Sequence, residues 1–260
     1  MKVYLFVLNC ILITTVFAQE KPVFEKAEFS FQGRTLPYRI LKPVDFDPAK
    51  GYPLHLFLHG AGERGNDNEA QLINGSSLFI KKSTAFPAIV IFPQCPKDDY
   101  WAQTTPSRDE QAGENQFNFP EKSTPGWAMQ AVMALLDEQL THEYVDKERV
   151  YLSGLSMGGM GTYELLARQP DIFAAATPIC GGTNTQTVEI WAHTIPIWIF
   201  HGEEDRVIPA RYSKIMVEAL IRQGIEPRFS LYPGVGHNSW DRAFKEPDLF
   251  SWIYSHRKSH

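Results

Sequence analysis

The chain has 260 residues, a net charge of −5 at pH 7 and 43% hydrophobic residues. This length suits one α/β domain with a full core, because single domains of this class commonly run to about 200–250 residues. The mild negative charge is not that of a nucleic-acid-binding protein, which typically carries clustered Lys and Arg. We therefore expect no nucleic-acid partner.

The N-terminus carries the pattern of a secretory signal peptide. Lys2 is followed by a mostly apolar stretch at residues 3–17 and by the small residue Ala18. This pattern predicts a leader over residues 1–18, with cleavage after Ala18. The apolar stretch is shorter than the about 20 residues of a membrane span, although a single N-terminal anchor is the alternative. We expect a secreted or periplasmic protein of one domain, residues 19–260, without stable membrane insertion after leader removal.

Eight apolar runs rich in strand-forming residues follow the leader. The two runs at residues 54–58 and 88–92 are almost entirely apolar, which is typical of strands buried on both faces of a parallel sheet. The first two runs, joined at Gly33-Arg34, predict an antiparallel edge. The predicted strands are residues 28–32, 36–41, 54–58, 88–92, 150–153, 174–179, 197–201 and 229–232.

Helical patterns lie between the later strands. Thr124-Pro125 offers an N-cap with proline at the first helical position, and further helices are predicted at residues 157–168, 209–222 and 241–256, the last interrupted by Pro247. Strands alternating with helices predict a parallel sheet with helices on both faces. Residues 96–124 show no regular periodicity, and so long a loop is usually functional or loosely ordered.

The most informative motif is Gly154-Leu155-Ser156-Met157-Gly158, which matches G-x-S-x-G. A predicted strand precedes it and a predicted helix follows it, so the serine is expected at the tip of a tight turn. The start of that helix offers backbone N–H groups and a positive dipole end beside the hydroxyl. A buried structural turn is the alternative, because the motif alone also occurs by chance.

A nucleophilic serine needs a base and a group that orients the base. Asp205 lies just beyond a predicted strand end, and His237 lies on a glycine-rich loop after the last strand. The order Ser156, Asp205, His237 is that of α/β-hydrolases. Either Glu203 or Glu204 is an alternative to Asp205 as the orienting acid. His201, on a predicted buried strand, is interpreted as a hydrogen-bonded core residue.

With these motifs, the chain resembles secreted single-domain serine esterases of the α/β-hydrolase superfamily. It is similar to feruloyl and acetylxylan esterases, polyhydroxybutyrate depolymerases and the catalytic domain of prolyl oligopeptidases. The matching pieces are residues 58–65, 154–159, 201–207 and 236–240. The resemblance implies an α/β-hydrolase fold, with a mostly parallel eight-stranded sheet and helices on both faces. Residues 180–196 leave no room for a large lid domain.

The resemblance also assigns roles. Ser156 would be the nucleophile, His237 the general base and then acid, and Asp205 the orienter of His237. The oxyanion hole would use the backbone N–H groups of Ala61 and Met157. His59 is expected to tie the oxyanion loop by hydrogen bonds. Glu63 and Arg64 would form a structural pair, or alternatively touch the substrate.

The implied activity is that of a serine carboxylic-ester hydrolase acting through an acyl-enzyme on feruloyl or acetyl esters of plant polysaccharides. The expected partner is thus an ester substrate, with polymeric carbohydrates among the candidates. A peptidase of prolyl-oligopeptidase type and an inactive carbohydrate-binding module on the same scaffold are the alternatives. Residues 96–124 would form one wall of an open site. Aromatic side chains that could contact substrate, or be core residues instead, are Trp101, Phe117, Phe119, Trp127, Trp191 and Trp240.

Neither a metal site nor a cofactor is expected, because the eight histidines form no spaced pair of the kind that binds zinc. Cys95 and Cys180 follow strands that should lie three inter-strand steps apart, about 14 Å. A disulfide needs Cα atoms within about 7 Å. We therefore expect two free thiols.

Overall fold

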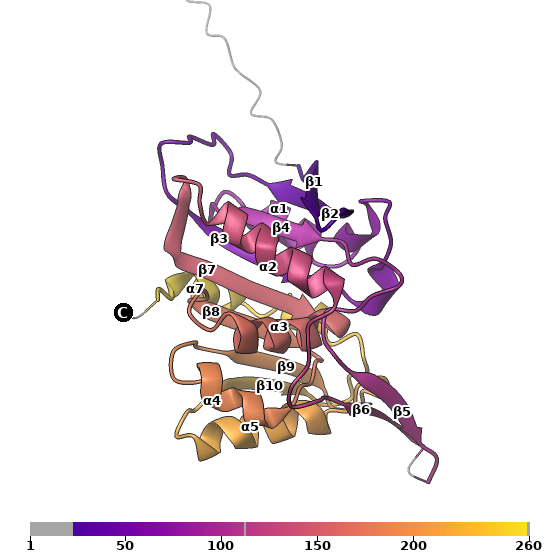
Figure 1. Cartoon of the computed structure of the whole chain (residues 1–260). Helices are drawn as coiled ribbons and strands as arrows, with labels where there is room; N and C mark the ends of the chain where they lie inside the picture. The colour runs from indigo at the N-terminus through magenta and orange to yellow at the C-terminus, as the bar shows by residue number, and fades with distance from the viewer. Residues whose placement is uncertain (1–22, 112, 259–260) are drawn as a thin grey trace, which may run out of the picture.

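A computed structural model describes residues 23–111 and 113–258 of the chain (Figure 1). The predicted signal peptide, residues 1–18, lies outside the described residues. An eight-stranded sheet forms the centre, with the strand order β1-β2-β4-β3-β7-β8-β9-β10. Its strands are β1 (Glu25–Phe31), β2 (Arg34–Leu41), β3 (Tyr52–Leu58), β4 (Ile89–Pro93), β7 (Val145–Leu155), β8 (Ala175–Ile179), β9 (Trp198–Gly202) and β10 (Arg228–Tyr232).

The sheet is mostly parallel. Only β1 with β2 and β2 with β4 pair antiparallel, and the pairs β4–β3, β3–β7, β7–β8, β8–β9 and β9–β10 are parallel. The inner strands β3, β4, β8 and β9 are buried at every position, as their apolar runs predicted. The parallel strands therefore end at one edge of the sheet, and the loops that follow them meet there.

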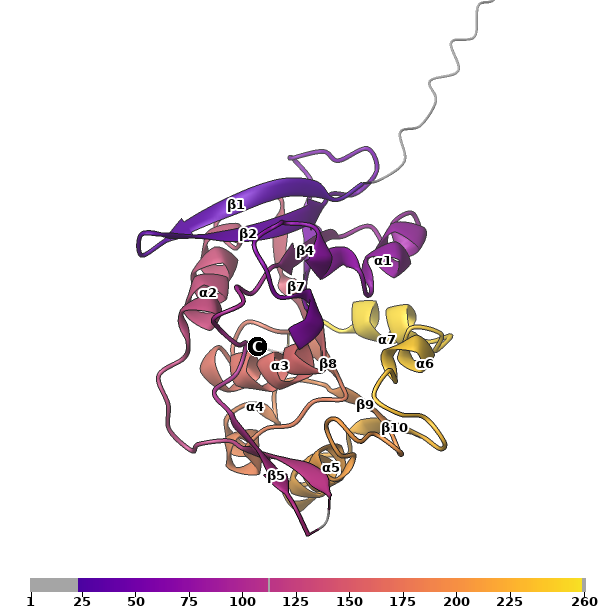
Figure 2. The same cartoon turned by 90° about the vertical axis from the view of Figure 1, so that its right-hand side faces the viewer.

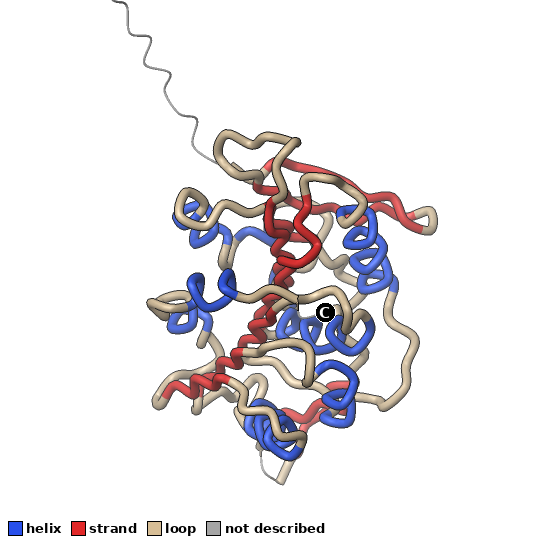
Figure 3. Tube along the Cα trace, turned by 90° about the vertical axis from the view of Figure 1, so that its left-hand side faces the viewer, coloured by secondary structure: helices blue, strands red, loops and turns tan. Residues whose placement is uncertain are grey.

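Helices cover both faces of the sheet, as Figures 2 and 3 show. One face carries α2 (Trp127–Gln139), α3 (Met157–Arg168), α4 (Val188–Trp191) and α5 (Arg211–Arg222). The other carries α1 (Ser76–Lys82), α6 (Trp240–Ala243) and α7 (Leu249–Ser255). Each layer encloses its own apolar core against the sheet. This architecture confirms the predicted α/β-hydrolase fold.

The structure corrects several predicted elements. The stretch 96–124 contains a β-hairpin, β5 (Thr105–Asp109) with β6 (Glu114–Asn118), which projects from the molecule beside α5 (Figure 2). Its strands are largely polar, so no apolar alternation marked them. The helices α1 and α4 and the short 3₁₀ helices η1 (Ala61–Glu63), η2 (Ala70–Leu72) and η3 (Thr185–Thr187) were also not predicted.

The beginning of α2 was predicted wrongly. The helix begins at Trp127, and a carboxylate oxygen of Asp99 accepts the backbone N–H of Ala128 at 2.7 Å. A distant residue therefore caps this helix instead of Thr124. At the C-terminus, the interruption expected at Pro247 is present, because α6 and α7 are separate helices on either side of it.

Two predicted absences concern the described residues. Between β8 and β9 these residues form only η3 and α4, so no large lid domain covers the strand ends. Cys95 and Cys180 are both buried free thiols, which confirms the prediction for this pair. Within residues 23–111 and 113–258, no helix is long and apolar enough to cross a bilayer.

Candidate active site

Ser156 lies in a strained turn between β7 and α3. Its φ of +55° places a non-glycine residue in the left-handed region. Its N–H donates to the carbonyl of Ile179 at 2.9 Å, which fixes the turn against β8. A Cβ atom on Gly158 would lie 1.9 Å from the carbonyl oxygen of Leu58, and one on Gly154 would lie 2.1 Å from the carbonyl oxygen of Gly158. The glycines of the motif are therefore required by close backbone contacts.

Three side chains converge at the carboxyl edge of the sheet. The Oγ of Ser156 lies 2.8 Å from Nε2 of His237, and Nδ1 of His237 lies 2.7 Å from Oδ2 of Asp205. The three residues follow β7, β9 and β10, so the parallel topology brings them together. An ionised carboxylate only accepts hydrogen bonds, so Nδ1 carries the proton that it donates to Asp205. Nε2 is then free to accept the serine hydroxyl proton.

The carboxylate of Asp205 is fully buried and strongly hydrogen-bonded. Its Oδ1 accepts the backbone N–H groups of Val207 at 2.8 Å and Ile208 at 2.9 Å. Burial by itself raises the pKa of Asp205, but hydrogen bonds from His201 and His237, the charge of His237 and the Ile208 N–H outweigh it. The pKa of Asp205 is consequently well below its usual range, and the group is anionic at neutral pH.

Close backbone packing sets the relative position of the acid and the base. The N–H of Glu204 donates to the carbonyl of Val235 at 2.9 Å. A Cβ on Gly202 would lie 2.2 Å from the carbonyl oxygen of Gly236, so glycine allows the two loops to touch. Glu203 and Glu204 are exposed, and neither of these alternative acids contacts His237.

His201 contacts the same carboxylate oxygen as His237 does. Its Nε2 lies 2.8 Å from the carbonyl oxygen of Ile208 and 3.3 Å from Oδ2 of Asp205. Both neighbours are acceptors, so Nε2 carries a proton, and Nδ1 accepts the hydroxyl of Ser213 on α5 at 2.7 Å. His201 is buried and hydrogen-bonded, as its place on a buried strand predicted.

The loop after β3 lies directly against the nucleophile. A Cβ on Gly60 would come within 3.6 Å of the Cβ of Ser156, which places the Gly60–Ala61 backbone beside the serine. Ala61 and Met157 are the first residues of η1 and α3, and an N–H at the first position of a helix has no intrahelical acceptor. Neither N–H group therefore has an acceptor within its own helix.

His59 holds this loop in place. Its Nδ1 donates to the carbonyl of Gly60 at 2.6 Å, while Nε2 accepts the N–H of Cys95 at 3.0 Å. Burial lowers the pKa of His59 to about 4, so the ring is neutral at pH 7. Glu63 accepts the side chain of Asn74, and Arg64 donates to the carbonyls of Ala61 and Asp99. Glu63 and Arg64 therefore stabilise the loop separately, because each is bonded to other residues.

A second Ser–His pair lies deep in the sheet and differs in its surroundings. Nε2 of His55 lies 2.8 Å from Oγ of Ser153, and Nδ1 lies 3.2 Å from the hydroxyl of Tyr254. His55 is fully buried, and burial lowers its pKa to about 3. Among the residues that the structure describes, no carboxylate is hydrogen-bonded to this ring, and both members are buried, so their hydrogen bonds join strands and helix in the core.

Two of the four tryptophans that were candidates for substrate contact are core residues instead. Trp101 and Trp191 are both fully buried. The indole N–H of Trp101 donates to the carbonyl of His59 at 3.1 Å, so this residue supports the loop beside Ser156. Trp191 packs against Tyr163 in the core. Trp240 is half-buried with its ring edge-on to His237, 5.5 Å between centroids.

The segment 96–124 contacts the site through its hairpin. Asn115 of β6 donates to the carbonyls of Arg206 and Val207, next to Asp205, at 3.3 and 3.1 Å. The hydroxyl of Tyr212 accepts the N–H of Phe117 at 2.7 Å. Phe117 and Phe119 pack on the same Tyr212 ring. The half-buried aromatics therefore form a flank of the site, whereas Trp127 lies away from it, against β1.

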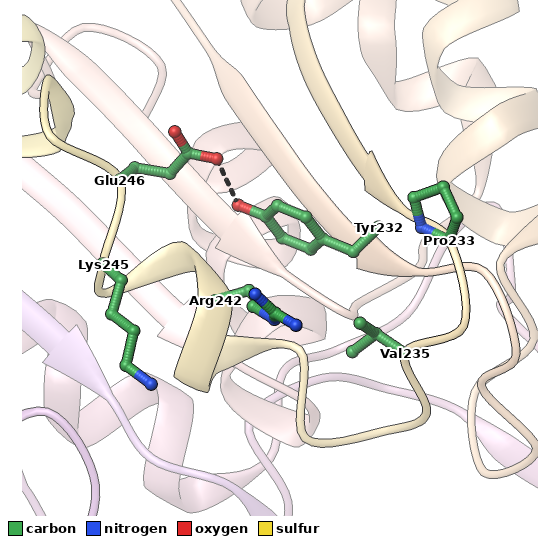
Figure 4. A pocket seen from close by; sticks show the side chains of 6 residues that line it. All are labelled: Tyr232, Pro233, Val235, Arg242, Lys245 and Glu246. Carbon is green, nitrogen blue, oxygen red and sulfur yellow. Dashed lines mark hydrogen bonds between the residues drawn. The ribbon is translucent and has the colours of Figure 1, made fainter.

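A hollow of about 380 Å³ borders the loop that carries His237 (Figure 4). Val235 of the loop and Arg242 of α6 line it, together with Lys245. Tyr232 donates its hydroxyl to Glu246 at 2.7 Å on the far wall. The loop thus has open space on one side, while its other side packs on the Asp205 loop.

The sequence pattern of the Phospholipase/Carboxylesterase family matches residues 49–254. The chain belongs to this family. The matched span contains every element of the site described above, from the Gly60 loop to His237.

Several known proteins resemble this chain. A thermostable esterase of solved structure is 32% identical, with a TM-score of 0.79 over 90% of this chain and 63% of that chain. Carboxylesterase SOBER1 of Arabidopsis thaliana is 25% identical over 214 residues, covering 76% of this chain and 88% of that protein. A bifunctional acetylxylan esterase/xylanase of Neocallimastix patriciarum is 37% identical over 79 residues, which are 30% of this chain and only 12% of that protein.

Proposed function

We propose that Ser156, His237 and Asp205 form the catalytic triad of this carboxylesterase, and that it hydrolyses esters through an acyl-enzyme. The supporting observation is the continuous chain of hydrogen bonds from the serine hydroxyl through the imidazole to the buried carboxylate. Its distances of 2.8 and 2.7 Å meet the requirement for a base within reach of its nucleophile. An inactive binding module would not need this series of hydrogen bonds.

The proposed reaction begins when Oγ of Ser156 attacks the ester carbonyl carbon and its proton passes to Nε2 of His237. The carbonyl oxygen becomes an oxyanion, stabilised by the N–H groups of Ala61 and Met157, and one such donor typically contributes about 3 kcal/mol. The carbon–oxygen bond to the alcohol then breaks, and the alcohol leaves with the proton from Nε2. Water attacks the acyl-enzyme in the same way and regenerates Ser156.

The anionic Asp205 stabilises the imidazolium that forms in each half of this reaction. Because its pKa lies far below neutrality, the carboxylate does not take the proton itself. His201 and the N–H groups of residues 207 and 208 hold the carboxylate in place beside the His237 ring. They therefore contribute to catalysis by positioning.

For the substrate, we propose feruloyl or acetyl esters of plant polysaccharides. Two observations support this choice. In the described chain no large lid covers the strand ends, so a bulky or polymeric ester can approach. The partial likeness to an acetylxylan esterase/xylanase agrees with it. We also propose export, with a mature chain that begins at Gln19, since a polymeric substrate lies outside the cell.

The triad is tested by the variant Ser156→Ala. We expect kcat on p-nitrophenyl acetate to fall by at least about 10⁴-fold, because the oxyanion hole and binding alone leave only a small residual rate. Labelling of the protein by a fluorophosphonate probe should also disappear. The matched control is Ser153→Ala, which breaks the buried pair with His55 and should keep both activity and labelling. Loss of labelling in Ser153→Ala but not in Ser156→Ala would refute the assignment.

The substrate class is tested separately, with methyl ferulate, p-nitrophenyl acetate, acetylated xylan and a chromogenic peptide as substrates. Turnover of the ferulate or xylan ester without peptide cleavage is the expected result. Peptide cleavage at a comparable kcat/KM would favour the peptidase alternative instead.

A further inference from the structure

A thiol completes a group of three metal-binding side chains at the triad. One ligand atom each from Cys180, Asp205 and His237 lies within 4.8 Å of the other two. We propose that this group binds a thiophilic divalent cation, such as Zn²⁺ or Cd²⁺, and that the bound ion stops the esterase reaction. The inhibition rests on the proposed function, whereas the binding does not. The sequence shows no metal motif because the three residues follow three separate strands.

The spacing suits a small tetrahedral ion. Zinc binds sulfur at about 2.3 Å and nitrogen or oxygen at about 2.0–2.2 Å, which places neighbouring ligands about 3.4–3.6 Å apart. The ligand atoms here lie between the hydrogen-bond distance of 2.7 Å and the limit of 4.8 Å. Shifts of about 1 Å would therefore bring them to zinc geometry. The site is a near fit that the ion itself completes.

The donor set favours zinc-like ions over calcium or magnesium. Thiolate and imidazole are ligands of Zn²⁺ and related metals, whereas Ca²⁺ and Mg²⁺ take oxygen. When the ion binds, the thiol proton leaves to solvent and the single proton of the imidazole moves from Nδ1 to Nε2. A thiolate, a carboxylate and a neutral imidazole then balance the two positive charges, which suits a buried location.

The backbone holds Cys180 in this position. Its φ of +41° is rare for a residue with a side chain, and its N–H donates to the carbonyl of Phe200 at 2.8 Å. A Cβ on Gly181 would lie 2.5 Å from the carbonyl carbon of Gly159, so this segment packs tightly on the serine turn. The ligand atoms of Cys180 and Asp205 lie within 4.8 Å of each other, and burial first, then the charge of Asp205, raise the pKa of the Cys180 thiol.

The hydroxyl of Ser239 is available to the same site. It is fully buried and makes no hydrogen bond of good geometry among the described residues, although it lies near enough to the thiol to affect its pKa. A water molecule in the fourth position on the ion would give this hydroxyl a partner. The His237 side chain is the accessible member, with 21% of its surface exposed, and its loop borders the hollow lined by Val235.

The bound ion would inhibit by occupying the base. Nδ1 of His237 would contact the metal instead of Asp205, so the ring would lose its orientation and the anion that stabilises its charged form. It could then not take the proton of Ser156. We therefore expect saturating Zn²⁺ to lower p-nitrophenyl acetate turnover by at least about tenfold, while Mg²⁺ and Ca²⁺ have no effect.

The direct test of binding uses Cd²⁺ and the ultraviolet absorption of a cadmium–thiolate bond, measured on the full chain carrying Ser156→Ala. This variant retains all three ligands, so the expected absorption band does not depend on catalysis. Adding Cys180→Ser should abolish the band, whereas the matched variant Cys95→Ser should leave it. A missing band, or one that survives Cys180→Ser, would overturn the proposed site.

The inhibition is tested with Cys180→Ser alone, each variant being compared with its own metal-free rate. Removing a ligand should raise the Zn²⁺ concentration for half-inhibition by at least about tenfold, while Cys95→Ser stays as sensitive as the unaltered chain. Equal Zn²⁺ sensitivity of Cys180→Ser and the unaltered chain would contradict the proposal. If the cadmium band is present but no ester is hydrolysed, the proposed function fails and the metal site stands.

Discussion

The position of the Ser156 hydroxyl is set by the surrounding backbone more than by the serine side chain itself. The left-handed φ costs of order 1–3 kcal/mol and persists because surrounding contacts over-determine it. These contacts include the bond to Ile179 and the glycine packing on Leu58. The strain exposes the hydroxyl at the carboxyl edge of the sheet, where the imidazole can reach it.

The glycine contacts give a sharp prediction for Gly158→Ala. Its Cβ would overlap the carbonyl of Leu58, a backbone atom of a central strand that cannot move aside. We expect a loss of more than about 4 kcal/mol in the free energy of unfolding, or no folded protein at all. Gly62→Ala is the control, because nothing lies within 4 Å of its Cβ, and it should change stability by less than about 0.5 kcal/mol. Urea unfolding measures both, and similar values for the two variants would disprove the steric account.

At the residue scale, the candidate triad could be named because the glycine spacing around Ser156 and the order of the serine, acid and histidine are read directly from the sequence. Asp205 could not be separated from Glu203 and Glu204 on those grounds, since all three are acids in one loop. The structure distinguishes them, because it is Asp205 that forms the hydrogen bond with His237. Trp101 and Trp191 were misjudged because the burial of an aromatic ring depends on how distant elements pack.

At the scale of elements, the β5–β6 hairpin is attached to the domain at two places. Asn115 binds the Arg206 and Val207 carbonyls, and α5 supplies the ion pair of Arg211 with Glu114 and the two hydrogen bonds of the Tyr212 hydroxyl with Phe117. Arg211 and Tyr212 lie at the start of α5, the helix whose Ser213 binds His201. The hairpin and the acid of the proposed triad therefore share one support.

We predict that Tyr212→Phe discriminates between small and bulky esters. Without the hydroxyl, the hairpin loses its anchor beside the site, so kcat/KM for methyl ferulate or acetylated xylan should fall by about tenfold, or about 1.4 kcal/mol. Turnover of p-nitrophenyl acetate should change little. Tyr232→Phe, which loses a hydrogen bond to Glu246 on the other side of the site, serves as the control. An equal decrease on all esters in Tyr212→Phe would show that the hairpin has no role in substrate contact.

Elements with a strong apolar period could be predicted, and those held by distant contacts could not. The buried strands β3 and β4 stood out as apolar runs, and their predicted bounds agree with the structure within two residues. The hairpin is polar and exposed, and α2 receives its cap from Asp99. Neither feature leaves a local pattern in the sequence.

For the whole molecule, buried neutral histidines link stability to pH. Burial lowers the pKa of His55 to about 3, whereas in the unfolded chain it is near 6.5. Between these values the unfolded state binds more protons than the folded state, so the free energy of unfolding rises with pH. The stabilisation is complete above about pH 6.5 and is lost as the pH falls toward 3.

We therefore predict that His55 contributes a decrease of about 3 kcal/mol in the free energy of unfolding between pH 7 and pH 4. His55→Gln removes the titrating group and should flatten this part of the pH dependence, even if the variant is less stable at pH 7. Urea unfolding at both pH values measures the difference. An unchanged slope in the variant would show that other groups cause the acid sensitivity.

The long strand β7 also separates two ends of the molecule. Ser156 follows its last residue, while the N–H of Lys258, near the chain terminus, donates to Glu148 close to its start at 2.9 Å. Eight residues of extended strand span about 26 Å. Attachment of the enzyme to a solid support through its C-terminus should therefore leave the reacting face turned outward, so that the immobilised protein still reaches an insoluble polymer.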